Sequence, residues 1–163
     1  ELLQRLRVEL GMALILITHD LGVVAGIVDR VNVMYAGYIV ETAPVEEVFK
    51  DPRHPYSLGL MASIPRLDQL RGSRLTPITG LPPDLIDMPA GCPFQPRCPY
   101  AVQDSLHRNP PLAPVGPRHW AACWVDVRKA TAHEPGAVGE NPPNPGIEAA
   151  AVGAVAGAAG RPA

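Results

Sequence analysis

The chain of 163 residues lacks any apolar run long enough to cross a lipid bilayer. The apolar run from about Gly11 to Ile17 and the Ala- and Gly-rich run at 149–160 are both much shorter than the roughly 20 consecutive apolar residues that a membrane-spanning helix needs. No basic segment precedes an apolar one at the start, so no signal peptide is predicted. The chain starts within a helical pattern and without Met, which leads us to expect a fragment of a longer protein.

Net charge and aromatic residues are also scarce. The formal net charge is −2 and aromatic residues make up 5% of the chain. A nearly neutral chain gives no electrostatic reason to expect a nucleic acid partner or an anionic membrane surface. Three Cys is an odd number that cannot form a closed set of disulfides, so a reducing cytoplasm is the simpler setting.

The first 64 residues, by contrast, are dense in secondary-structure signals. A leucine stripe at spacings of four predicts a helix over 1–10, and Gly11 is a natural end for it. The apolar run over 12–18 is typical of a parallel strand buried on both faces. His19 follows this strand at its carboxyl end, where open α/β sheets bind their ligands, and a second helix is expected over 20–29.

A strand at 31–35 and its partner at 38–41 are predicted to form a hairpin around Ala36-Gly37. Glu41 is expected on a solvated edge of that hairpin. Short helices are expected at 44–49 and at 56–63.

The pattern weakens after Pro65. Residues 65–125 are rich in Pro and contain all three Cys, which predicts an irregular extension with few regular elements. Residues 126–163 are rich in Ala, Gly and Pro. Because such a segment buries too little apolar surface to offset its ordering entropy, we expect a disordered tail there.

Several short motifs occur in a fixed order along the first 124 residues. They are Ile17–Asp20, Asp29–Glu41, His54-Pro55-Tyr56, Gly91–Cys98, Pro110–Leu112 and Ala122-Cys123. In this order they resemble the C-terminal part of the ATP-binding subunit of a dipeptide/oligopeptide (peptide/nickel) ABC importer. The implied fold class is α/β: the C-terminal part of a P-loop ABC ATPase domain over residues 1–64, then the Cys/Pro-rich extension and the disordered tail.

The resemblance implies a role for His19. In the family the equivalent histidine contacts the γ-phosphate of ATP and helps to hold the attacking water, and an imidazole N–H is a suitable donor for this purpose. The implied cofactors of the intact subunit are ATP and Mg²⁺. The implied partners are a second ATPase subunit, transmembrane permease subunits and, through the complex, an extracytoplasmic peptide-binding protein. The implied location is peripheral, on the cytoplasmic face of the inner membrane.

Other parts of such an ATPase are absent from this sequence. It contains no G-x-x-x-x-G-K-[ST] phosphate loop, no Leu-Ser-Gly-Gly signature and no apolar run ending in Asp-Glu. We therefore expect this polypeptide alone not to hydrolyse ATP, while the parent subunit does so as a dimer. The solute is not predicted, since dipeptides, oligopeptides and nickel chelates are handled by similar ATPases.

The cysteines allow three interpretations. Family members with four such Cys are candidates for an iron–sulfur cluster, but this chain has Ser105 near the expected third position, leaving Cys92, Cys98 and Cys123. A metal site would then need Ser105, His107, His119 or an outside ligand. Zinc or a disulfide is the second interpretation. Three reduced, partly buried thiols in a proline-stiffened lobe are the third.

His54-Pro55-Tyr56 is interpreted as structural, with Pro fixing a turn and Tyr56 packing. Two rival functions remain open at this point. One is a stand-alone thiol-rich metal or redox module, and the other is a non-catalytic remnant that pairs with an intact ATPase.

Overall fold

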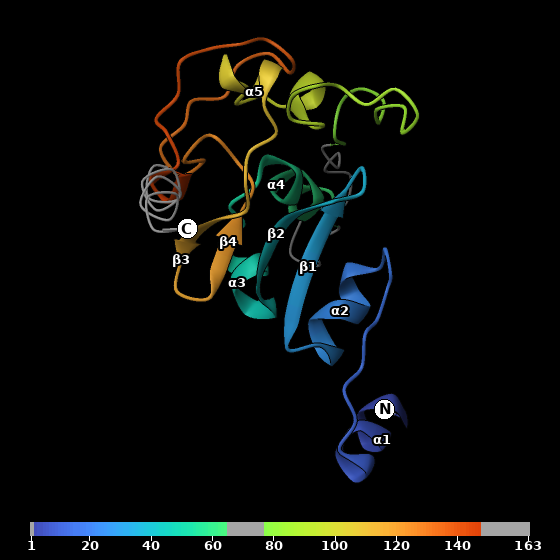
Figure 1. The fold of residues 1–163 in the computed structure, drawn as a ribbon. Coiled ribbons are helices and arrows are strands. Elements are labelled where there is room, and N and C mark those ends of the chain that lie inside the picture. Colours follow the sequence, from blue (N-terminus) through green and yellow to red (C-terminus); the bar gives the residue numbers. More distant parts are fainter. Residues whose placement is uncertain (1, 65–76, 148–163) are drawn as a thin grey trace, which may run out of the picture.

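The computed structural model describes residues 2–64 and 77–147, and its centre is a four-stranded antiparallel sheet in the order β1-β2-β4-β3 (Figure 1). The elements in chain order are α1 (Leu2–Leu10), α2 (Leu21–Ile27), β1 (Arg30–Tyr35), β2 (Tyr38–Pro44), α3 (Val45–Lys50), α4 (Pro55–Ala62), η1 (Gln95–Arg97), α5 (Asp104–His107), β3 (Ala113–Gly116) and β4 (His119–Ala121). Within the described residues, none of the helices has the length and apolar character that crossing a membrane requires.

The β1–β2 hairpin forms as its sequence predicts. Side chains of β1 alternate between solvent and core, with Val33 and Tyr35 buried. The turn places Ala36 at φ 47° and Gly37 at φ 83°, so both central residues are left-handed. Two left-handed residues match the twist of a tight antiparallel hairpin, and Gly37 adopts this conformation without strain.

Residues from beyond position 112 complete the sheet. β4 pairs with β2 through Glu41↔Ala121 and Thr42↔Trp120, and β3 pairs with β4. The main core is also shared: Phe94, Cys98 and Ala101 are in the same buried cluster as the core residues of β1 and β2. The predicted ATPase part (1–64) and the predicted extension (65–125) therefore share one sheet and one core.

The predicted strand at 12–18 is not formed among the described residues. The segment is extended, but no neighbouring strand hydrogen-bonds to it. Ile15 and Ile17 are 91% and 95% exposed, whereas Leu14 and Leu16 are half-buried. The prediction was wrong for this chain because a central parallel strand needs partners on both edges, and the described residues supply none.

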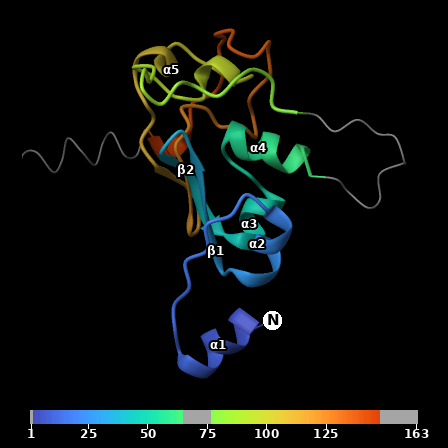
Figure 2. The same cartoon turned by 90° about the vertical axis from the view of Figure 1, so that its right-hand side faces the viewer.

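α1 lies apart from the body of the molecule, beyond the extended segment (Figure 2). None of its residues is buried. Its contacts with the rest of the chain include polar ones: Arg7 pairs with Asp29 at 2.9 Å, and the Gln4 amide donates to the Gly26 carbonyl at 2.7 Å. Gly11 ends the helix at φ 60°, as expected for a left-handed C-terminal residue.

The expectation of a disordered tail from residue 126 onward is corrected for residues 126–147. This segment, orange to red in Figure 1, passes along the top of the molecule and hydrogen-bonds repeatedly to the loop at 98–101. Asn144 is 1% exposed, and a β-bridge pairs Val125 with Pro143. Specific backbone and amide hydrogen bonds replace the missing apolar burial. The rest of the predicted tail, 148–163, lies outside the described residues.

Candidate functional site

His19 lies at the junction between the extended segment 12–18 and α2, and its side chain is exposed. Neighbouring residues fix the backbone on its C-terminal side. Asp20 is the N-cap of α2, and its Oδ1 accepts from the N–H groups of Gly22 (2.9 Å) and Val23 (3.2 Å). Thr18 Oγ1 accepts from the Asp20 N–H at 3.0 Å. The imidazole is therefore presented to solvent from an ordered turn at a helix start.

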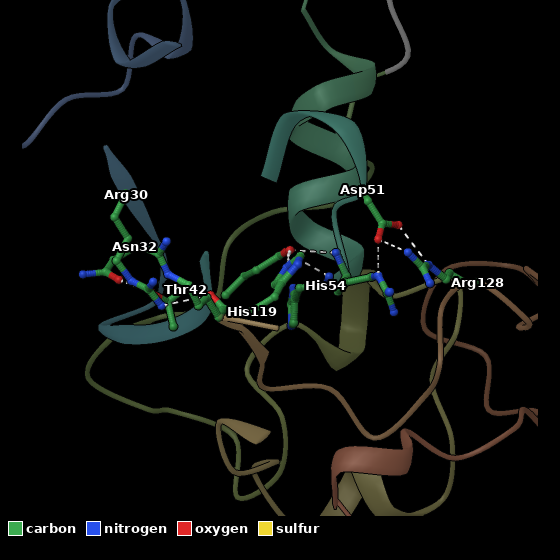
Figure 3. A network of polar contacts seen from close by, with 10 residues as sticks. Arg30, Asn32, Thr42, Asp51, His54, His119 and Arg128 are labelled. Carbon is green, nitrogen blue, oxygen red and sulfur yellow. Dashed lines mark hydrogen bonds and ion pairs between the residues drawn. The ribbon is translucent and has the colours of Figure 1, made fainter. Parts of the chain in front are cut away.

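Glu41 is the common acceptor of a buried polar network that includes His54 and His119, two residues labelled in Figure 3. It is fully buried on β2, and its carboxylate accepts three hydrogen bonds. Oε1 accepts from the Arg53 N–H and from His119 Nε2, both at 2.7 Å. Oε2 accepts from the His54 N–H at 3.0 Å. One carboxylate thus joins β2, the loop before α4 and β4, and the expectation of a solvated Glu41 was wrong.

His54 is the N-cap of α4. Its Nδ1 accepts from the Tyr56 N–H at 3.0 Å, and Pro55 occupies the first helical position. Burial lowers the pKa of His54 to about 4, against a smaller opposing effect of the Glu41 carboxylate. His54 is therefore neutral at pH 7, as an accepting Nδ1 requires.

Tyr56 packs against two aromatic rings of the core. Its ring centroid lies 4.7 Å from that of Tyr35 and 5.6 Å from that of Phe94. Tyr35 and Phe94 meet edge to face at 5.2 Å. The contacts favour the structural interpretation of His54-Pro55-Tyr56: the motif starts a helix and supplies a ring to the shared core.

The three cysteines and Ser105 line one small cavity of about 20 Å³ beneath the loops that carry them. That volume has room for about one water molecule. All three cysteines are free. Burial raises the pKa of each thiol, that of Cys98 to about 12, so protonated thiols are favoured at neutral pH.

The other metal ligands considered from the sequence lie elsewhere. His119 is bound to Glu41, and His107 is exposed on α5. Neither lines the cavity. Among residues 2–64 and 77–147, no three His, Cys, Asp or Glu side chains are arranged to hold a metal ion.

Sequence comparison supports one family. Residues 40–104 match the family "Oligopeptide/dipeptide transporter, C-terminal region". A peptide import ATP-binding protein of Brucella ovis is 48% identical over 134 residues, covering 78% of this chain and 40% of the relative. The oligopeptide transport ATP-binding protein OppD of Salmonella typhimurium is 48% identical over 128 residues (78% and 38%). OppD of Bacillus subtilis is 47% identical over 125 residues (77% and 35%).

Residues 40–104 thus match the C-terminal region of oligopeptide/dipeptide transporters, and over 78% of its length the chain is similar to peptide-import ATP-binding proteins. It spans 35–40% of the length of these three relatives. The family match begins at Val40, on β2, and ends at Asp104, so it covers Glu41, the α4 N-cap and two of the cysteines.

Sequence reasoning predicted some of these features and missed others. It singled out His19 and the cysteines; the structure brings the cysteines to one cavity, and His19 is not among the residues that line it. It missed the network around Glu41. A local signal existed, because Glu41 interrupts the β-forming strand Tyr38–Pro44, but its partner His119 lies 78 residues further along the chain.

Proposed function

We propose that these residues form the C-terminal part of an ATPase subunit that powers import of di- or oligopeptides across the cytoplasmic membrane. The observation that carries the proposal is the extended segment 12–18, which exposes Ile15 and Ile17 almost completely and ends in the exposed His19. Exposed apolar surface costs about 25 cal/mol per Å², and an unpaired extended backbone invites pairing. In the intact subunit, other strands of the ATPase domain pair with this segment.

His19 acts in this proposal as a hydrogen-bond donor to the γ-phosphate. ATP, with Mg²⁺, supplies the phosphoryl group that is transferred to water. The phosphate loop is absent from this sequence, so residues outside this chain hold most of the nucleotide. The part of His19 is to aim one ring N–H, from the Asp20-capped turn, at charge that develops during transfer.

The remaining residues form an accessory lobe on this ATPase part. We assign residues 1–64 to the ATPase domain and residues 77–147 to the lobe, and the β2–β4 pairing joins the two. The subunit works on the cytoplasmic face of the membrane with a second ATPase subunit, the permease subunits and a peptide-binding protein. Nucleotide-driven closure of the ATPase pair drives the permease between its access states.

Substitution of His19 in the intact subunit tests the proposal. In the assembled complex, His19→Ala is expected to lower the turnover of ATP by about 10²–10³-fold, as loss of one oriented donor does in other enzymes. His19→Gln, which keeps an N–H donor, is expected to retain more turnover. His107→Ala is the matched control, because His107 is an exposed histidine on α5.

Unchanged ATP turnover in His19→Ala would contradict the assigned role. Two further measurements separate the rival functions. A stand-alone metal or redox module predicts stoichiometric metal on the 163-residue chain. A non-catalytic remnant predicts that the chain binds neither metal nor nucleotide but binds a partner ATPase subunit.

A further inference from the structure

The loops around the cysteine cavity are fastened by the segment 126–147, hereafter the strap. The Gly136 N–H donates to the Cys98 carbonyl at 3.1 Å, and the Asn144 side-chain amide donates to the Cys123 carbonyl at 2.9 Å. The strap thus hydrogen-bonds to the backbone carbonyls of two of the three cysteines. In the opposite direction, the side-chain amide of Gln95 donates to the Gly136 carbonyl of the strap at 3.1 Å.

The strap also runs along the loop that follows Cys98. The N–H groups of His133 and Gly139 donate to the carbonyls of Pro99 and Ala101, each at 2.9 Å. The His133 ring contributes a bond from Nε2 to the Ala101 carbonyl at 3.1 Å. Hydrogen bonds between the strap and the loop at 98–101 therefore occur at several successive positions. In this respect the strap pairs with the loop much as one strand pairs with its neighbour.

Ser105 lies near the position where family members carry a further cysteine. Its hydroxyl group makes both of its hydrogen bonds to the backbone of Val102. Its hydroxyl donates to the Val102 carbonyl at 2.5 Å and accepts from the Val102 N–H at 3.1 Å. The Ser105 carbonyl accepts from the Cys92 N–H at 2.9 Å. Ser105 therefore ties the Cys92 loop to α5 and has no spare hydroxyl proton to lose to a metal.

The cavity itself does not fit an iron–sulfur cluster. A four-iron cluster has eight inorganic atoms and normally takes four thiolates. This cavity has room for about one water molecule. The cysteines at positions 92, 98 and 123 line it, but among the described residues they are not arranged as a metal-binding group. The residues present therefore disagree with the cluster that the family resemblance implies.

We infer that the cysteine lobe of this chain is closed by its own strap and by the Ser105 turn, with the three thiols as core groups rather than metal ligands. The strap substitutes for the cross-link that a cluster supplies, because it fixes the backbone at Cys98 and Cys123 from outside. The inference concerns the lobe alone and holds whether or not His19 contacts ATP.

Anaerobic reconstitution tests the absence of a cluster. The full chain is incubated with ferrous iron, sulfide and a thiol reductant, desalted, and assayed for iron and sulfide, with a bacterial apo-ferredoxin treated in parallel. We expect the ferredoxin to take up its cluster and this chain to retain substoichiometric iron. Stoichiometric iron and sulfide on the chain would overturn the inference.

Alkylation of the thiols under native conditions tests the strap. Gly136 has φ 84°, and a Cβ there would lie 2.9 Å from the Pro96 carbonyl oxygen. Gly11→Ala is the matched control, since Gly11 has φ 60° and nothing within 4 Å. We expect Gly136→Ala to speed alkylation of Cys98 and Cys123 by about tenfold over Gly11→Ala, because only Gly136→Ala displaces the strap.

A milder variant covers the case in which Gly136→Ala does not fold. Gln95→Glu removes the amide donor to the Gly136 carbonyl while keeping the side chain's size. Faster alkylation of Cys98 in Gln95→Glu than in Gly11→Ala supports the strap. Alkylation rates equal to those of the unaltered chain in every folded strap variant would refute it.

Discussion

Glu41 is expected to be the polar side chain on which the fold depends most. Its carboxylate is fully buried and serves three donors: the N–H groups of Arg53 and His54 and the ring of His119. A buried donor left without an acceptor costs about 1–3 kcal/mol. Glu41→Ala orphans all three and leaves a cavity, so we expect a loss of about 3–5 kcal/mol or more.

Such a loss approaches the whole stability of a domain, about 5–15 kcal/mol, so Glu41→Gln is the informative variant. The introduced amide keeps the volume of the side chain and one carbonyl oxygen. That oxygen best replaces Oε1, which serves Arg53 and His119, and the new NH₂ group then faces the His54 N–H. One hydrogen bond to a charged acceptor is lost, which corresponds to about 1.5–3 kcal/mol.

Urea unfolding followed by tryptophan fluorescence measures the effect, since Trp120 lies on β4 next to His119. Glu46→Gln is the control, because Glu46 is exposed on α3 and its pair with Lys50 spans 3.9 Å. The control is expected to change stability by less than about 0.5 kcal/mol. If Glu41→Gln also changes the free energy of unfolding by less than about 0.5 kcal/mol, the carboxylate does not hold β2, the loop before α4 and β4 together.

Three further outcomes are expected. Burial lowers the pKa of His54 from 6.5 to about 4. The contribution of neutral His54 to the free energy of unfolding is therefore complete above pH 6.5. On the order of 3 kcal/mol of that free energy is lost as the pH falls towards 4. His54→Asn, which keeps a helix-capping acceptor, is expected to flatten that part of a pH series of urea unfolding curves. Asp20→Ala should cost about 1 kcal/mol through loss of the α2 cap, and hydrogen exchange should localise the loss to α2. Gly37→Ala should lower the thermal midpoint because φ is 83° there, whereas Gly26→Ala in α2, with nothing within 4 Å of its Cβ, should not.

The elements that the sequence predicted well are those with local causes. The hairpin follows from alternating β-forming residues around Ala36-Gly37, and the helix predicted at 56–63 forms as α4, which begins one residue earlier, at Pro55. The start of α2 follows from Asp20, whose side chain satisfies the first N–H groups of the helix. In each case the decisive interaction spans no more than a few residues.

The features that the sequence did not predict depend on distant segments. The burial of Glu41 requires β4 to pair with β2 across 78 residues, and no local pattern reports that pairing. The strap has the composition of a disordered tail, but Asn144 and His133 give it specific partners near Cys123 and Ala101. The strand predicted at 12–18 failed for the opposite reason, since its pattern assumes neighbours that the described residues do not contain.

Hydrogen exchange across residues 13–17 tests most directly that this chain is one part of a larger ATPase domain. Their amides are compared in the isolated 163-residue chain and in the longest native polypeptide that contains it. We expect fast exchange in the isolated chain and strong protection in the native polypeptide, where neighbouring strands pair with the segment. Equally fast exchange in both would contradict this expectation.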